Sequence, residues 1–384
     1  MKILHVCHDF FSTKLYTILI QSFSKNGYFQ NVFVFLRRGQ PIYYEKQDVS
    51  NVIYNIVNLT RVQTYFMRFF FNYRNNFLYS LLLINNKKNN WNVLHAHTWF
   101  VNGGLAWYIK KKNKIPYIVA VRNSDINFIY NYLFWFRKIG WNILSESEKI
   151  IFISYSYRNK VLNLAHKNDR NWIAEKSIVI PNPIDLFWYN NIGSAKEKKD
   201  LKFINLLFVG EINKNKRVGK IIDLVILLNQ IGIKATLNII GDFNTSFLHL
   251  IKIRYKINKY KFISHSNFQN DKSKLKSIYS KSDIFIMPSK FETFGLVYVE
   301  AMTQGTPVIY TRGQGFDGFF EEGTVGYSVD GEDMLEMKER IFDIINNYSK
   351  ISENCINFSN LFSEDEINKR YVSVYKDVLN FFDK

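Results

Sequence analysis

The stretch PSKFETFGLVYVEAMTQGTPVI, residues 288–309, joins apolar runs through loop-forming residues and places two glutamates eight positions apart. The apolar run 283–287 predicts a buried strand that stops at the following proline. Residues 296–302 predict a short helix with Gly305 as its C-terminal cap, and residues 306–310 begin another strand. Strand, loop, helix and strand in this order are the repeating unit of a parallel sheet, so the stretch predicts an α/β fold.

The two glutamates lie at either end of this helical segment. Glu292 is in the loop at the carboxyl end of the strand, and Glu300 is one turn inside the helix. A helix N-terminus carries about half a positive charge and binds phosphate well. We therefore expect a diphosphate on the backbone amides, and sugar hydroxyls on the two carboxylates; the amides are those of Thr293, Phe294, Gly295 and Leu296. Two ordinary solvated acids near a helix start fit the spacing equally well.

Length and composition indicate two folded domains. The chain has 384 residues, more than one typical core holds, and its apolar content of 47% is typical of a folded protein. Alternating strands and helices are predicted along both halves, and the polar segment 186–201 is predicted to be the interdomain linker. The predicted strands are 2–7, 31–36, 93–98, 117–121, 149–154 and 177–182, and then 204–212, 235–242 and 261–265.

Charge is concentrated in the first half of the chain. The formal net charge is +18, and residues 1–190 carry 24 basic and 9 acidic residues, a net +15. This favours an anionic partner for the first half: nucleic acid, acidic lipid or a phosphate-bearing substrate. Two cysteines, Cys7 and Cys355, suit a reducing compartment, and neither a signal peptide nor an uninterrupted apolar run of 18 residues is present. We expect a cytoplasmic protein.

The segment 282–309 resembles the Glu-x7-Glu signature of the family 4 glycosyltransferases, which are retaining enzymes with the two-domain GT-B fold. The likeness is strongest over residues 204–310. It implies two Rossmann-like domains that face a central cleft. The expected parts are an acceptor-side domain at 1–190, a nucleotide-sugar-binding domain at 191–365 and a C-terminal helix at 366–384 that packs back on the first domain.

The resemblance also implies roles for individual residues. Glu300 corresponds to the family's ribose-binding glutamate, and Glu292 to the glutamate that faces the donor sugar near the reacting carbon. Residues 208–220, FVGEINKNKRVGK, are similar to the family's Val-Gly-Arg…Lys segment, in which a basic pair neutralises the donor pyrophosphate. Lys216 falls on the family's lysine, but Glu211 replaces its arginine, so that Arg217 or Lys214 would supply the second charge. Gly210 and His265 complete the expected nucleotide-binding set. A solvated basic loop is the alternative for 208–220.

A glycine-rich segment follows the second predicted strand of the opening stretch. RGQGFDG, residues 312–318, fits Gly-x-Gly-x-x-Gly, the pattern of dinucleotide-binding folds. The residues after it allow barely one helical turn, however, where that motif requires a helix. A glycine-containing loop near the donor sugar, as in the resembled family, explains the segment better.

Three further polar residues are candidates in the first half. His95 and His97 alternate on a strand end and are predicted to face opposite sides, one packing in the core and His97 reaching the cleft. Arg122 stands where related enzymes often have a histidine near the donor sugar, and we expect it to contact the sugar or a phosphate. The chain has no Asp-x-Asp, and the histidines have no acidic or cysteine neighbour, so no metal is expected.

Two segments interleave aromatic with basic residues: 65–88, with Arg68, Arg74, Lys87 and Lys88, and 127–138. Core packing with snorkelling basic side chains and peripheral contact with an anionic bilayer fit this pattern equally. Nucleic acid is not expected, because no recognised binding module is present.

The resemblance implies a retaining hexosyltransferase of bacterial surface-polysaccharide assembly, such as capsule or O-antigen. A nucleotide sugar, UDP-linked by family frequency, would donate to a lipid-linked or oligosaccharide acceptor, without a cofactor. The enzyme would be cytoplasmic, with possible peripheral attachment to the inner face of the membrane. The alternatives are a sugar phosphorylase or nucleotide-sugar epimerase of the same fold, and a non-catalytic basic protein that binds membranes or nucleic acid.

Overall fold

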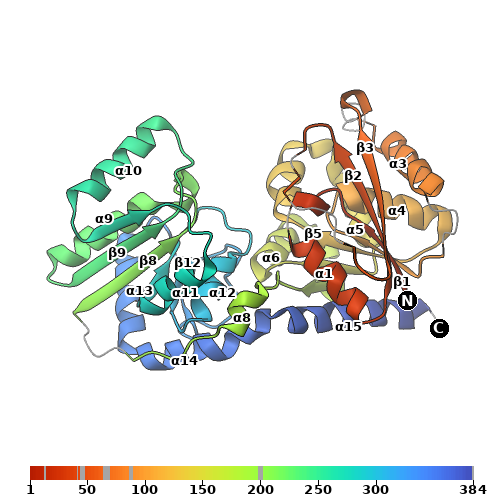
Figure 1. Ribbon diagram of the computed structural model, residues 1–384. Helices are drawn as coiled ribbons and strands as arrows, with labels where there is room; N and C mark the ends of the chain where they lie inside the picture. The colour runs from red at the N-terminus through yellow and green to blue at the C-terminus, as the bar shows by residue number, and fades with distance from the viewer. Residues whose placement is uncertain are drawn as a thin grey trace. The chain divides into compact units, whose positions relative to one another are not determined.

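The computed structural model divides the chain into two compact units (Figure 1). The first unit comprises Met1–Ile153, Tyr157–Pro181 and Ile367–Lys384; the second comprises Ser154–Ser156 and Asn182–Glu366. The residues described are 1–12, 14–40, 42–43, 48–63, 70–85, 90–197 and 202–382.

A seven-stranded parallel sheet with the order β3-β2-β1-β4-β5-β6-β7 forms the centre of the first unit. The order reverses between β1 and β4, as in doubly wound Rossmann sheets. The strands are β1 (Lys2–Val6), β2 (Phe29–Arg37), β3 (Val52–Leu59), β4 (Val93–Ala96), β5 (Tyr117–Val121), β6 (Lys149–Phe152) and β7 (Ser177–Val179).

Helices that are distant in sequence cover this sheet. Phe23 of α1 (Lys14–Lys25) and Tyr375 of α15 (Glu364–Phe382) share a core cluster with Ile3 and Val93 of the sheet. The last helix of the chain therefore completes the core of the first unit. The other helices are α3 (Phe71–Asn85), α4 (Val101–Asn113), α5 (Arg137–Ser145), α6 (Tyr155–Leu164) and α7 (Arg170–Lys176), with a π-helical turn at Asp125–Tyr130.

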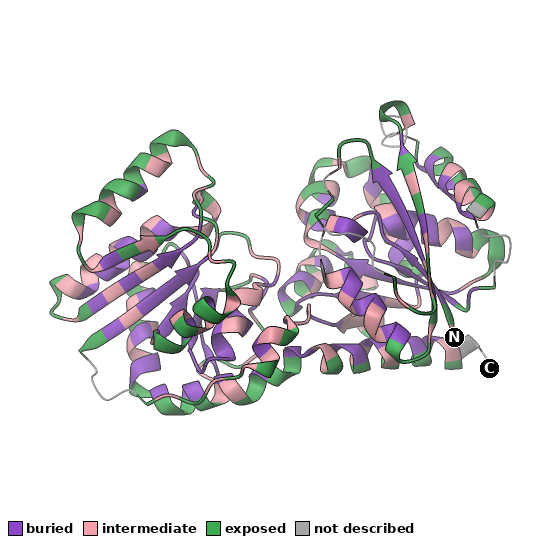
Figure 2. Cartoon of the chain, in the orientation of Figure 1, coloured by how far each residue is buried: buried purple, intermediate pink, exposed green. Residues whose placement is uncertain are grey.

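The second unit repeats the arrangement with a six-stranded parallel sheet in the order β10-β9-β8-β11-β12-β13. Its order reverses between β8 and β11, and its strands are largely buried (Figure 2). The strands are β8 (Phe203–Val209), β9 (Lys234–Ile240), β10 (Ile263–Ser266), β11 (Ile284–Ile286), β12 (Val308–Thr311) and β13 (Gly326–Val329). The helices are α8 (Leu186–Asn190), α9 (Val218–Gln230), α10 (Phe247–Lys259), α11 (Lys272–Lys281), α12 (Leu296–Met302), α13 (Met334–Asn346) and α14 (Tyr348–Ser359).

The predicted α/β fold with two Rossmann-like sheets is confirmed, and two local expectations need correction. The segment predicted to be a linker begins with helix α8, whose Trp188 is only 1% exposed in the core of the second unit. Strand β3 was not predicted, because it is an edge strand that leaves Ile53 and Ile56 exposed and lacks a clear apolar face. No helix in the described ranges is long and apolar enough to cross a bilayer.

Candidate active site

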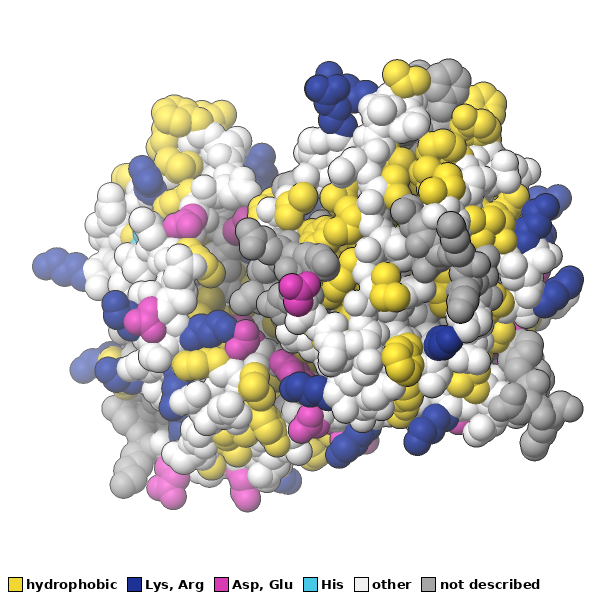
Figure 3. Space-filling model, turned by 45° about the vertical axis from the view of Figure 1, so that its right-hand side comes forward, with side chains coloured by type: hydrophobic (Ala, Val, Ile, Leu, Met, Phe, Trp, Pro, Cys, Tyr) yellow, Lys and Arg dark blue, Asp and Glu magenta, His cyan; other side chains and the backbone are white. Residues whose placement is uncertain are grey.

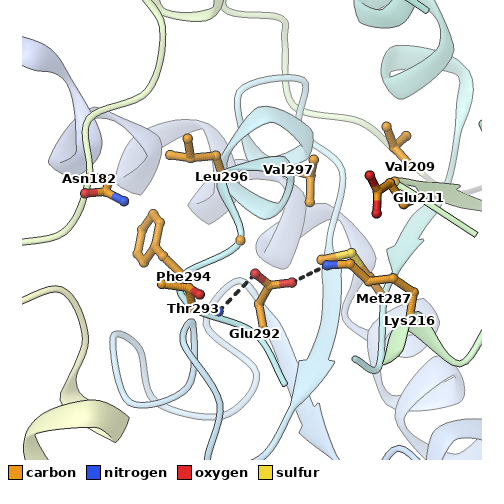
Figure 4. A pocket seen from close by; sticks show the side chains of 12 residues that line it. Asn182, Val209, Glu211, Lys216, Met287, Glu292, Thr293, Phe294, Leu296 and Val297 are labelled. Atoms are coloured by element: carbon orange, nitrogen blue, oxygen red, sulfur yellow. Dashed lines mark hydrogen bonds and ion pairs between the residues drawn. The ribbon is translucent and has the colours of Figure 1, made fainter. Parts of the chain in front are cut away.

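A cavity of about 360 Å³ opens in the second unit at the carboxyl ends of β8 and β11. The sheet order reverses between these two strands, which is where open α/β sheets bind their ligands. Figure 4 shows the lining side chains. Most of them come from the ends of β8 and β11, the turn that holds Lys216, the loop before α12 and the start of α12. They belong to Asn182, Val209, Glu211, Lys216, Met287, Glu292, Thr293, Phe294, Leu296 and Val297, with Gly210 and Gly295 completing the wall.

Lys216 and Glu292 form an ion pair inside this cavity (Figure 4). The Lys216 Nζ lies 2.6 Å from Glu292 Oε2, and the two side chains are only 19% and 13% exposed. The backbone N–H of Thr293 donates to the other carboxylate oxygen at 3.1 Å. Lys216 itself is held in a 3-10 turn whose N-cap, Asn213, accepts from its backbone N–H. The pair is thus fixed at both ends before any ligand binds.

Two glycines shape the loop that carries Glu292. Gly295 has a φ of +87°, and a Cβ there would lie 2.4 Å from the Tyr298 ring. A Cβ on Gly315 would lie 2.4 Å from the carbonyl carbon of Thr293, and its backbone N–H donates to the Glu292 carbonyl at 3.0 Å. The Gly-x-Gly-x-x-Gly segment is therefore a support for the Glu292 loop. Residues 312–320 form turns with no helix after them, in contrast to a dinucleotide motif.

Glu300 lies in α12, outside the lining of this cavity, and is half-buried. Burial raises the pKa of its carboxyl to about 7, although a hydrogen bond from the Tyr279 hydroxyl and the charge of Lys272 act in the opposite direction. The Tyr279 Oη lies 3.1 Å from Glu300 Oε2. Lys272 is paired with Asp185 at 2.5 Å. The Glu300 carboxyl can therefore accept a hydrogen bond in either protonation state, and its charge changes near neutral pH.

Most of the residues expected to bind the nucleotide line the cavity, but Glu300, Arg217 and His265 do not. Arg217 has a left-handed backbone, and its guanidinium donates to Glu332 at 2.8 Å and to the Pro288 carbonyl at 3.2 Å. The His265 Nε2 lies 2.9 Å from the Gly241 carbonyl oxygen. Among the described residues that line the cavity, Lys216 alone carries a positive charge.

The prediction that His95 and His97 face opposite sides is wrong, because residues two apart on a strand share a face. Their rings stack with centroids 4.0 Å apart in the first unit, and His97 is 1% exposed. His5, the register partner of His95 on β1, completes the cluster, with its Nδ1 3.1 Å from His97 Nε2. The His95 Nδ1 lies 2.5 Å from the Tyr375 hydroxyl of α15. The histidines thus join the central strands to the last helix.

This cluster brings nitrogen atoms of three histidines close together, and a positive charge lies beside it. Nitrogen atoms of the three histidines lie within 4.8 Å of one another. Burial lowers the pKa of His5 to about 3. Burial first, and then the neighbouring histidine and Arg122 charges, also lower the pKa of His95 and His97. Arg122, whose Nε donates to the His97 carbonyl at 3.3 Å, would repel a dication. The arrangement favours three neutral imidazoles.

A second cavity, of about 520 Å³, lies in the first unit at the carboxyl ends of its central strands and was not anticipated from the sequence. Its wall is mainly aromatic and aliphatic, with Arg74 as a buried cation that is 9% exposed. The Arg74 Nη2 donates to the Phe100 carbonyl at 3.2 Å, and its guanidinium lies 4.8 Å from the Phe71 ring centroid. A Cβ on Gly104 would lie 2.6 Å from Nη2, so this glycine makes room for the arginine.

No carboxylate in the described part of the chain forms an ion pair with Arg74, although two acidic residues also line the cavity. Asp125 accepts from the backbone N–H groups of Trp99, Phe100 and Arg122, and Asp9 pairs with His8 at 3.0 Å. Burial raises the pKa of Asp125 to about 6. A buried guanidinium without an acidic partner is costly, and an anionic ligand would offset that cost.

Two Rossmann-like parallel sheets in one chain are the architecture of the GT-B fold. The family profile described as Glycosyltransferase Family 4 matches residues 16–187, and that described as Glycosyl transferases group 1 matches residues 191–360. The chain belongs to the family 4 glycosyltransferases, and the resemblance inferred from the Glu-x7-Glu segment is confirmed.

Individual relatives and solved structures are similar to this chain over most of its length. An uncharacterized 41.2 kDa protein in the cps region of Klebsiella pneumoniae is 27% identical over 311 residues, which cover 78% of this chain and 82% of that protein. The apo lipopolysaccharide outer core galactosyltransferase WaaB has a TM-score of 0.74 at 15% identity and covers 98% of this chain and 99% of its own. Anabaena Alr3699/HepE in complex with UDP has a TM-score of 0.68 at 16% identity, with 98% and 100% covered. At such identities the solved structures show a shared fold.

Proposed function

We propose that this protein is a retaining hexosyltransferase that uses a UDP-sugar to extend a lipid-linked saccharide in surface-polysaccharide assembly. The buried Lys216–Glu292 pair at the switch point of the second unit is the observation that carries the proposal. The UDP complex of a protein with the same fold supports the donor, and the cps-region relative supports the pathway class.

In the proposed reaction, the donor diphosphate lies against Lys216 and the backbone of residues 293–296. Lys216 stabilises the charge that grows on the departing diphosphate. Glu292 accepts a hydroxyl of the transferred sugar, and Glu300 accepts the ribose hydroxyls. Retention follows from attack on the same face that the diphosphate leaves, with a phosphate oxygen taking the proton of the acceptor hydroxyl. Arg122 and His97 contact each other within the first unit, where His97 is buried, and we assign both a structural role.

The acceptor is proposed to occupy the cavity of the first unit. Its apolar wall fits a lipid chain, and Arg74 fits the phosphate that joins such a chain to a saccharide. Phe128 and Trp135, which line this cavity, are 60% and 47% exposed, and the adjacent Phe134 is 66% exposed. Arg137 and Lys138 follow in the sequence. These side chains suit peripheral contact with an anionic membrane. Of the other segment with this pattern, Arg68, Lys87 and Lys88 lie outside the described residues.

Thermal unfolding with UDP, GDP, ADP and NAD tests the donor assignment. A ligand at about 100 times its Kd stabilises the native state by about 2.7 kcal/mol. We expect stabilisation by UDP that is reduced in Glu300→Ala and in Lys216→Ala. The anomeric coupling constant of the product, measured by NMR after incubation with UDP-hexoses and a prenyl-diphosphate-linked sugar, tests retention. An inverted product would reject the proposed stereochemistry, and absence of any nucleotide effect would reject the donor site.

A further inference from the structure

Helix α10 of the second unit exposes an apolar face that its own fold does not use. Four large apolar side chains are strongly exposed: Phe247 by 74%, Leu248 by 81%, Ile251 by 48% and Tyr255 by 64%. With 3.6 residues per turn, these four positions fall on one side of the helix. The helix lies at the outer edge of the second unit in Figure 1, and hydrophobic side chains gather at this edge in Figure 3.

The opposite side of α10 already supplies the packing that folding requires. Ile253 is 1% exposed and belongs to the core cluster of the second unit, with Ile257 packed against the same cluster. A Cβ on Gly219 of α9 would lie 3.2 Å from Ile253 Cδ1, which shows how closely α10 approaches α9. The outer face is therefore a second apolar surface on one helix.

Basic residues border this outer face on both sides. On an ideal helix, Arg254 falls on one edge of the apolar strip, while Lys252 and Lys259 fall on the other, and all three are exposed. The sequence of α10, FLHLIKIRYKINK, contains no acidic residue. Its remaining lysine, Lys256, turns toward the protein and pairs with Asp223 of α9. An exposed apolar strip between rows of positive charge is the pattern of a helix that lies in a membrane interface.

We propose that the outer face of α10 docks the second unit on an anionic lipid bilayer. Phe247, Leu248 and Ile251 would enter the boundary between headgroups and acyl chains, and the flanking basic residues would bind lipid phosphates. A second copy of the chain suits this face poorly, because a two-fold axis would bring the same basic rows against each other. This membrane attachment is independent of the transfer reaction. It is a second membrane contact, on the second unit, beside the one proposed for the first unit.

A probe on the helix itself separates this contact from any other membrane contact of the chain. Both native cysteines, Cys7 and Cys355, are buried, so a cysteine introduced by Leu248→Cys can be labelled selectively with an NBD fluorophore. The matched control is Ile231→Cys, at an exposed apolar position just after α9 that is 51% accessible. The labelled full-length proteins are titrated with vesicles of phosphatidylcholine alone and of phosphatidylcholine with phosphatidylglycerol.

We expect the NBD emission at position 248 to shift to the blue and intensify only with anionic vesicles, and to be quenched by spin-labelled acyl chains. The probe at position 231 should change by less than about a tenth as much. Combining Lys252→Gln with Arg254→Gln should lower the vesicle affinity of the 248-labelled protein about 30-fold, through loss of two favourable lipid contacts. A 248 signal unaffected by anionic vesicles, or matched by the 231 probe, would overturn the proposal. A blue shift without lipid that grows with protein concentration, together with a dimer in light scattering, would also overturn the proposal. That result would assign the apolar face of α10 to a second copy of the chain.

Discussion

Replacing Lys216 with methionine should separate the structural role of the Lys216–Glu292 pair from its role in binding the donor. The substitution keeps the length of the side chain but removes the only positive charge among the described residues that line the cavity. A hydrogen bond to a charged group contributes about 1.5–3 kcal/mol. Since about 1.4 kcal/mol corresponds to a tenfold change in Kd, the affinity for UDP should fall about 10- to 100-fold.

The same substitution should lower stability through a different cause. Removing one partner of a buried pair costs about 3–5 kcal/mol because the other charge stays buried. The Glu292 carboxylate still accepts the hydrogen bond from the Thr293 N–H and is 13% exposed, which reduces the cost of losing Lys216. We therefore expect a loss of about 2 kcal/mol in the free energy of unfolding. Adding Glu292→Gln removes the stranded charge and should recover most of this loss, while the affinity for UDP stays low.

Urea unfolding and isothermal titration with UDP on the wild type, both single variants and the double variant complete the cycle. The reasoning fails if Lys216→Met binds UDP with wild-type affinity, because the cavity then does not hold the diphosphate. It also fails if the double variant recovers stability and UDP affinity together, since Lys216 would then act only by keeping Glu292 in place.

Five other substitutions test four separate parts of the structure. Because burial raises the pKa of Glu300 to about 7, its contribution to stability is complete below pH 4.5 and is lost as the pH rises through 7. Glu300→Gln should therefore remove about 2 kcal/mol of pH dependence between pH 5 and 8, as measured by urea unfolding; identical pH profiles would contradict this. Gly295→Ala combines a positive φ with a steric clash and should destabilise by more than about 3 kcal/mol, whereas Gly313→Ala, with φ +70° and open space, should cost only about 1–2 kcal/mol. Equal losses in the two variants would show that the Tyr298 contact relaxes without cost. Arg74→Gln should weaken binding of farnesyl phosphate about tenfold while leaving binding of farnesol and the UDP-induced thermal shift unchanged; wild-type protein that binds the alcohol and the phosphate equally would exclude Arg74 as an anion ligand. Glu211→Arg, which restores the family's basic residue, should tighten UDP binding about tenfold in calorimetry, and unchanged affinity would mean that this position does not face the diphosphate.

The parts of the molecule that follow from short stretches of sequence were predictable, and those that depend on distant contacts were not. The opening stretch contains the strand, the glycine and the helix that place Glu292, so its local structure could be derived from spacing. The clash that makes Gly315 necessary lies with Thr293, 22 positions earlier, and has no local signature. Arg217 likewise pairs with Glu332, which no local pattern connects to it. The prediction that His95 and His97 face opposite sides did not fail for lack of a local signal. The two-residue period of a strand already places these residues on one face.

The charges in the cavity of the second unit bear on how an ion pair and the proposed donor site can coincide. Glu211, Lys216 and Glu292 line the cavity, so one cation faces two carboxylates where the proposed ligand is itself an anion. The Glu211 carboxylate is held aside by weak contacts with the amides of Asn213 and Asn244, both at 3.3 Å. Among the described residues that line the cavity, only Lys216 can supply a counter-charge to a diphosphate, and it would have to leave Glu292 to do so. In the proposed reaction, that exchange would free Glu292 Oε2 to accept a sugar hydroxyl when the phosphate binds. One event would then both neutralise the leaving group and provide a hydrogen-bond acceptor for the sugar. On this account UDP alone would leave Glu292 buried without its cation, and a UDP-sugar would bind more tightly than UDP by the hydroxyl contact that restores its partner.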